Sequence, residues 1–117
     1  MYSPQLLDHF QNPRNAGHID NANAEIQIEN PACGDVLELS ARIVEGRFAE
    51  VRFRAKGCVP AMACGSALTE LIEGRTVDEA RRLRREQLVE KVGGMPEASS
   101  HASFLALDAL SALLKKL

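Results

Sequence analysis

The sequence of 117 residues contains no tryptophan, and aromatic residues make up only 4% of it. Its core must therefore be built mainly from leucine, isoleucine, valine and alanine. Apolar residues reach 45%, which is typical of a folded globular domain. A net charge of −2 argues against nucleic-acid binding, since such proteins are usually basic. No stretch approaches the roughly 20 apolar residues of a membrane span, so we expect no association with membranes.

The N-terminal residues show neither the basic nor the apolar segment of a secretory signal, and we therefore expect a cytoplasmic protein. The sequence has three cysteines, an odd number that does not favour a disulfide framework. Thiols that stay reduced are available to bind a metal ion or to carry sulfur.

Alternating polar and apolar residues predict three strands at residues 25–28, 36–44 and 48–55. The pair Glu45-Gly46 separates the last two strands and is typical of a hairpin turn. The sheet is therefore expected to be antiparallel, with one face covered.

The remaining segments have helical signals. Ser3 and Pro4 suit the start of a first helix that ends before Pro13, and Thr76 begins a capping box. Further helices are predicted at 60–73, from 76 towards 83, at 86–92, and from about 99 or 100 to the end. In the last helix, an apolar stripe is expected to comprise Phe104, Leu107, Leu110, Leu114 and Leu117.

These elements predict an α+β fold, a three-stranded antiparallel sheet covered on one face by about five helices. Residues 1–117 are expected to form a single domain.

Three loop positions carry the chemistry. Cys33 and Asp35 lie in one predicted turn, where a thiolate and a carboxylate can face the same zinc or iron ion. A buried cysteine beside a turn-forming aspartate is the simpler interpretation of that pair alone. Cys58 lies between the third strand and a helix, where the helix N-terminus favours the thiolate.

Two further residues are candidates for the same site. Cys64 lies among small residues of the following helix, and it is either a core residue or a third thiolate. His101 lies in the first turn of the last predicted helix and could add a nitrogen ligand. His9 and His18 have no motif around them and are expected at the surface.

The segments with these residues resemble the U-type iron–sulfur cluster assembly scaffolds, the group of IscU and the N-terminal domain of NifU. The resemblance spans nearly the whole chain. It rests on several motifs in register: residues 2–3, 8–15 and Gly17, then 31–35, Gly57-Cys58 and 68–70.

The resemblance implies a protein that takes sulfur from a cysteine desulfurase, assembles a [2Fe–2S] cluster and passes it to apo client proteins. Zn²⁺ is the alternative occupant of the site. By resemblance, Cys33, Cys58 and His101 are ligands, and Asp35 is a ligand or a group that keeps the cluster transferable. Such a scaffold would be a carrier and not an enzyme, and a monomer or weak dimer.

The sequence departs from the family at two places. Ala102 stands where the family has a third cysteine, so either Cys64 replaces that thiol or the site works without it. The segment 94–99 keeps one proline and no lysine of the family's chaperone-recognition loop, which argues against chaperone binding. Two other functions therefore stay open: a zinc-dependent sulfur acceptor, and a regulatory relative that binds the desulfurase without holding a cluster.

One basic run, residues 81–85, belongs to no family motif mentioned above. Acidic residues interleave with it, which favours a solvated helix face. The alternative is a docking patch for an acidic partner protein.

Overall fold

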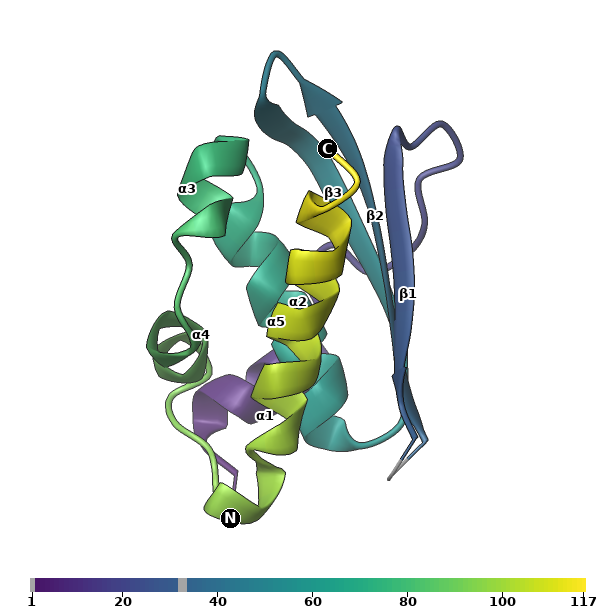
Figure 1. Cartoon of the computed structure of the whole chain (residues 1–117). Coiled ribbons are helices and arrows are strands. Elements are labelled where there is room, and N and C mark those ends of the chain that lie inside the picture. Colours follow the sequence, from purple (N-terminus) through teal and green to yellow (C-terminus); the bar gives the residue numbers. More distant parts are fainter. Residues whose placement is uncertain (1, 32–33) are drawn as a thin grey trace.

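In a computed structural model, residues 2–31 and 34–117 are described, and they form one sheet and a set of helices (Figure 1). The elements in chain order are α1 (Pro4–Gln11), β1 (Ala24–Asn30), β2 (Asp35–Val44), β3 (Arg47–Lys56), α2 (Val59–Ile72), α3 (Val77–Arg81), α4 (Arg85–Lys91), the 3₁₀ helix η1 (Glu97–Ser99) and α5 (His101–Leu114). No helix in this described part of the chain is long and apolar enough to cross a membrane. The α+β prediction is confirmed.

The sheet has the order β1-β2-β3 with both pairs antiparallel. Its tight hairpin between β2 and β3 turns at Glu45 and Gly46, whose φ angles are 51° and 74°. Two central residues with positive φ define the turn type that matches the twist of paired strands. The dipeptide that suggested a hairpin in the sequence therefore makes one.

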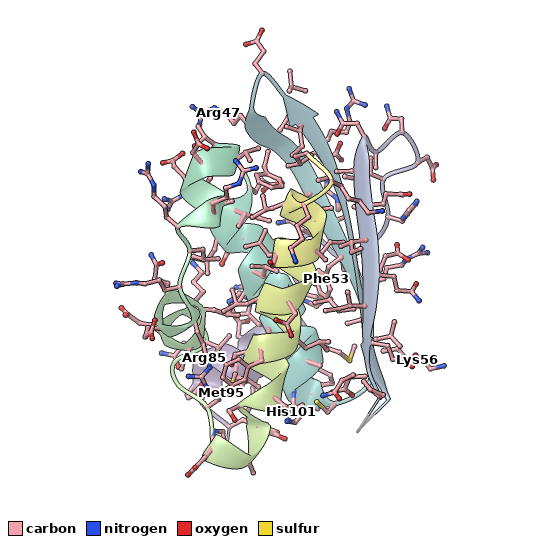
Figure 2. All side chains as sticks on the ribbon, viewed as in Figure 1. Arg47, Phe53, Lys56, Arg85, Met95 and His101 are labelled. Carbon is pink, nitrogen blue, oxygen red and sulfur yellow. The ribbon has the colours of Figure 1, made fainter. Side chains whose placement is uncertain are left out.

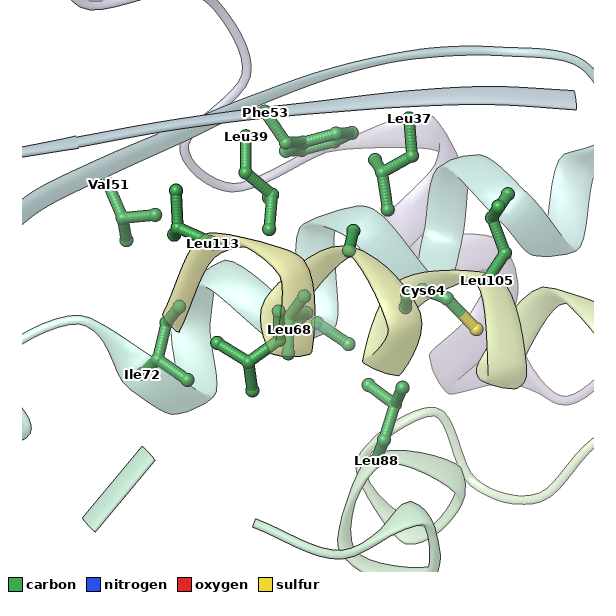
Figure 3. Packing of buried hydrophobic residues seen from close by; sticks show 14 of the residues in the cluster. Leu37, Leu39, Val51, Phe53, Cys64, Leu68, Ile72, Leu88, Leu105 and Leu113 are labelled. Carbon is green, nitrogen blue, oxygen red and sulfur yellow. The ribbon is translucent and has the colours of Figure 1, made fainter. Parts of the chain in front are cut away.

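Helices α2 and α5 lie against one face of the sheet, and α1, α3 and α4 lie outside them (Figure 1). Figure 3 shows the layer between them, where Leu37, Leu39 and Phe53 of the sheet point towards the helices. All three side chains are buried, as is Leu68 on α2. A core of aliphatic side chains and two buried phenylalanines follows from the scarcity of aromatic residues.

The other face of the sheet is partly covered by the segment between α1 and β1. Its start lies beside the edge of β3, where the Phe53 N–H donates to the Asn15 carbonyl at 2.9 Å. The segment then crosses to β2, and the Ile19 N–H donates to Ser40 Oγ at 3.1 Å. Ile19 and Ser40 are both buried, which explains a hydroxyl on the outer side of the central strand.

The predicted apolar stripe of α5 is wrong at two of its five positions. Phe104 is 53% exposed and Leu117 is 45% exposed. The helix is enclosed by the sheet on one side and by α2 and α4 on others, so it buries a wider surface than one stripe. Alanines fill much of that surface because they let neighbouring elements approach closely. The buried positions of this helix are Ala102, Ser103, Leu105, Ala106, Ala109, Leu110, Leu113 and Leu114.

His9 is buried, so its predicted place at the surface is wrong. Its Nδ1 lies 2.8 Å from Ser66 Oγ on α2, and the same hydroxyl accepts the Arg14 N–H at 2.8 Å. The Ser66 hydroxyl thus joins the imidazole of α1 to the backbone of the segment that follows α1. The bond between His9 and Ser66 fixes α1 to α2 in the interior.

Acidification through pH 6.5 is expected to destabilise the fold through His9. Burial, and next Arg14, lowers the pKa of His9 from its ordinary value of 6.5. Below pH 6.5 the unfolded chain binds a proton at His9 more readily than the folded chain does. The free energy of unfolding therefore decreases as the pH decreases. Urea unfolding at about pH 7.5 and about pH 5.5 measures the effect.

His9→Asn removes the titration and should flatten that pH dependence. His18→Asn is the matched control. His18 lies on the outer face of the sheet with its side chain 29% exposed, beside Glu25 and Glu38. An unchanged pH slope in His9→Asn would contradict the assignment.

Gly65 on α2 makes room for the ring of Phe53. A Cβ at this position would lie 2.6 Å from Phe53 Cδ2 and 2.9 Å from Cε2. Gly65→Ala is expected to destabilise by about 1–2 kcal/mol, because overpacking outweighs the gain in helix propensity. The double variant with Phe53→Leu should recover at least about half of the loss in thermal unfolding. Additive effects would show that the ring is not the obstacle.

Candidate metal centre

Three segments that are distant in the sequence meet at one end of the molecule. Asp35 is the first residue of β2, Cys58 immediately precedes α2, and His101 is the first residue of α5. Figure 2 shows His101 at the lower end of the view, and Lys56 at the lower end of the sheet. The end of a strand pair and the starts of two helices therefore position the three side chains.

The three ligand atoms form a small triangle. Cys58 Sγ lies 3.3 Å from Asp35 Oδ2 and 3.7 Å from His101 Nε2, and the last two atoms are 3.5 Å apart. Sulfur, nitrogen and oxygen donors at usual bond lengths around a tetrahedral ion lie about 3.3–3.8 Å from each other. The triangle therefore fits one face of such a coordination shell.

Asp35 is held in place by the backbone around it. The residue is 2% exposed, and the Cys58 N–H donates to its Oδ1 at 3.1 Å. This bond leaves Oδ2 directed at the thiol and the imidazole. Gly57 lies against the same carboxylate with φ of +140°, and a Cβ there would overlap Oδ1. Gly57 is thus a positioning residue that sequence reasoning missed, although a glycine at a strand-to-helix turn is a visible signal.

The helix N-terminus at Cys58 favours a reactive or ligating thiolate. Cys58 is the N-cap of α2, a helix of 14 residues, and has intermediate exposure. The positive end of a helix dipole stabilises a thiolate at this position. The His101 side chain is 38% exposed, so the triangle is open to solvent on that side.

Asp35, Cys58 and His101 have ligand atoms that all lie within 4.8 Å of one another. In the described part of the chain, no other group of three or more histidine, cysteine or acidic side chains meets this criterion. Cys33 lies outside the described residues. A thiolate, an imidazole and a carboxylate together suit zinc or iron.

Cys64 has a different environment from Cys58. It is completely buried in the core, and burial, followed by the charge of Cys58, raises the pKa of its thiol to about 12. A protonated thiol is a poor metal ligand. This favours the interpretation of Cys64 as a core residue, and its role as a ligand stays a prediction.

Ala102, at the position of the family's third cysteine, is also fully buried. Close to it, Arg85 Nε donates to Ser103 Oγ at 2.8 Å, and the guanidinium carbon lies 4.7 Å from the ring centre of Phe104. These contacts join α4 to the first turn of α5. The position of Arg85 in the sequence does not predict these two contacts.

The whole chain, residues 1–117, matches the family model described as the NifU-like N-terminal domain. Iron-sulfur cluster assembly scaffold protein IscU 1 of Archaeoglobus fulgidus is 40% identical over 110 residues, which are 94% of this chain and 72% of the relative. The protein of the same description, IscU, from Escherichia coli K12 is 36% identical over 117 residues, with 97% of this chain and 91% of the relative covered.

A solved structure agrees with the fold. The crystal structure of a nitrogen-fixing NifU-like protein (N-terminal) from Brucella abortus matches with a TM-score of 0.79 over 97% of this chain and 92% of that one. The identity is 18%, so this likeness concerns the fold alone. From the match of the family model and the two relatives, this chain belongs to the NifU-like N-terminal domain family.

Proposed function

We propose that this chain is a scaffold for iron–sulfur cluster assembly, on which a cluster is built and from which it is passed on. The observation that best supports this function is the triangle of Asp35, Cys58 and His101, whose ligand atoms are 3.3–3.7 Å apart. The names of the two IscU relatives support the same role. The cluster is cargo, so the protein acts as a carrier and not as an enzyme.

A [2Fe–2S] cluster would be held by Cys33, Asp35, Cys58 and His101. Thiolates bind iron strongly, and replacing part of an all-cysteine set by nitrogen or oxygen donors changes the stability and potential of a cluster. A mixed set is suited to a cluster that must leave again. We propose that apo iron–sulfur client proteins take the cluster through the side where His101 is partly exposed.

The sulfur would come from the persulfide of a cysteine desulfurase. The Cys58 thiolate attacks the terminal sulfur of that persulfide, a new S–S bond forms at Cys58, and the desulfurase cysteine leaves as its thiolate. His101 Nε2, 3.7 Å from Cys58 Sγ, is placed to take the thiol proton beforehand. Cys58 would thereby accept the sulfur, since Ala102, at the position of the family's third cysteine, has no thiol.

Anaerobic reconstitution with the desulfurase as the sulfur source tests this function. Absorption and Mössbauer spectra should show a [2Fe–2S] cluster on the natural chain and also on Cys64→Ser, because Cys64 is buried with a raised pKa. Loss of the cluster in Cys64→Ser, with the fold intact, would assign the missing thiol to Cys64. Absence of a cluster from both proteins would contradict the scaffold function.

A zinc-dependent sulfur acceptor is the second candidate. Asp35, Cys58 and His101 with Cys33 offer four donors, the number that a closed tetrahedral zinc site uses. Metal analysis directly after purification discriminates the two. Stoichiometric zinc that survives dialysis would favour the acceptor, and a protein that exchanges it readily for iron and sulfide would favour the scaffold.

A further inference from the structure

A groove of about 530 Å³ lies between α3 and the C-terminal half of α5. Its lining comprises Ala80, Arg81, Leu83, Leu107, Leu110, Ser111, Leu114, Lys115 and Leu117. Figure 1 shows α3 and the yellow end of α5 at the end of the molecule opposite to the start of α5. At a rise of 1.5 Å per residue, the lining positions of α5 from Leu107 to Leu114 lie about 9 to 20 Å along the helix from His101. The groove is therefore distinct from the metal centre.

The lining combines an apolar floor with positive charge. Five of its residues are leucines, two are the cations Arg81 and Lys115, and none is acidic. Leu117 remains 45% exposed, and Leu83 and Leu107 are only partly buried. These leucines give the groove an apolar floor that is partly open to water.

The charges of the rim are available to a partner. Arg81 Nη1 lies 3.3 Å from Asp78 Oδ1, but the two side chains are 50% and 78% exposed, and such surface pairs contribute little. Lys115 has no ion pair with any other residue that the structure describes. On the far side of Leu83, a smaller hollow is lined by Arg75 and Arg82 with one carboxylate, Glu79. Of the basic run in the sequence, Arg81 lines the groove and Arg82 lines the smaller hollow.

We propose that this groove binds an acidic amphipathic helix of a partner protein. A groove between two helices suits an amphipathic helix, whose leucine-type side chains at a spacing of three and four residues would enter between Leu83 and Leu114. Its glutamates or aspartates would meet Arg81 and Lys115. Because no residue of the groove lining belongs to the metal centre, a docked partner leaves that centre free. The inference does not rest on the chemistry of that centre.

Fluorescence anisotropy with two synthetic peptides tests the proposal on the full chain. Both peptides are amphipathic helices of about 18 residues with the same leucines, and one carries glutamates where the other carries lysines. The glutamate peptide should bind at least about tenfold more tightly, and added salt should reduce the preference. Equal binding of the two peptides, or no binding of the glutamate peptide, would overturn the proposal.

Matched charge reversals locate the binding. Arg81→Glu with Lys115→Glu should weaken the glutamate peptide about tenfold or more. Arg84→Glu with Lys116→Glu makes the same change of net charge at neighbouring positions outside the groove lining, and should weaken it less than about threefold. Thermal unfolding and zinc binding should be alike in both variants. Equal weakening of peptide binding by the two double variants would refute binding in the groove. Sedimentation showing that the groove instead holds a second copy of this chain would also refute it.

Discussion

Cys58→Ser is expected to lower the affinity for zinc by more than about 100-fold. Removing a residue that only hydrogen-bonds to a metal ligand already lowers metal affinity by up to about 100-fold. The thiolate is the softest donor of the triangle, and serine offers a neutral hydroxyl that binds metal weakly. Competition with a chromophoric chelator measures the affinity. The fold should persist, because Cys58 is an N-cap whose side chain makes no capping hydrogen bond.

Cys64→Ala is the matched control for that variant. It removes a thiol from the same stretch of chain, but one that is fully buried in the core. Its zinc affinity should stay within about threefold of the natural chain, whereas its stability should fall by roughly 1 kcal/mol through the small cavity. The reverse pattern, with affinity lost in Cys64→Ala and kept in Cys58→Ser, would show that the wrong cysteine has been assigned.

Gly57→Ala is expected to damage both the fold and the site. A φ of +140° is unfavourable for any residue with a side chain, and the new Cβ would overlap Asp35 Oδ1 and lie 2.7 Å from Asp35 Cγ. The backbone strain costs about 1–3 kcal/mol. The clash must in addition move the carboxylate away from Cys58 and His101, which should weaken metal binding about tenfold or more. Urea unfolding and a zinc titration measure the two effects separately.

Gly17→Ala separates strain from displacement. Gly17 has nearly the same backbone angle, φ of +133°, but a Cβ there would meet nothing within 4 Å. It should lose comparable stability and keep its zinc affinity. If both variants lost affinity equally, global destabilisation would be the cause, and Gly57 would have no special part in positioning Asp35.

Elements with local signals could be predicted well from the sequence. The capping box at Thr76 and Glu79 forms as expected, with both hydrogen bonds present. The hairpin at Glu45-Gly46 is a further example, since the turn type depends on two residues alone. Properties decided by distant partners could not be predicted. His9 is buried where it forms a hydrogen bond with Ser66, 57 positions later in the chain. The wide buried surface of α5 depends on the sheet and the helices that enclose it.

The candidate site shows the same division. Sequence reasoning placed Asp35, Cys58 and His101 each at an end of an element, and the structure has them there. Their convergence over separations of 23 and 43 residues does not follow from any periodicity. The family resemblance supplied that expectation, and the distances support it. The close approach of Gly57 to Asp35 needed the three-dimensional structure.

X-ray absorption at the zinc edge of the zinc-loaded chain tests the central claim most directly, namely that Asp35, Cys58 and His101 bind one metal ion together with Cys33. The account predicts two sulfur donors at about 2.3 Å and two nitrogen or oxygen donors at about 2.0 Å. One sulfur should disappear in Cys58→Ser and one histidine signal in His101→Ala. A shell of oxygen donors alone, or a sulfur count that Cys58→Ser leaves unchanged, would contradict it.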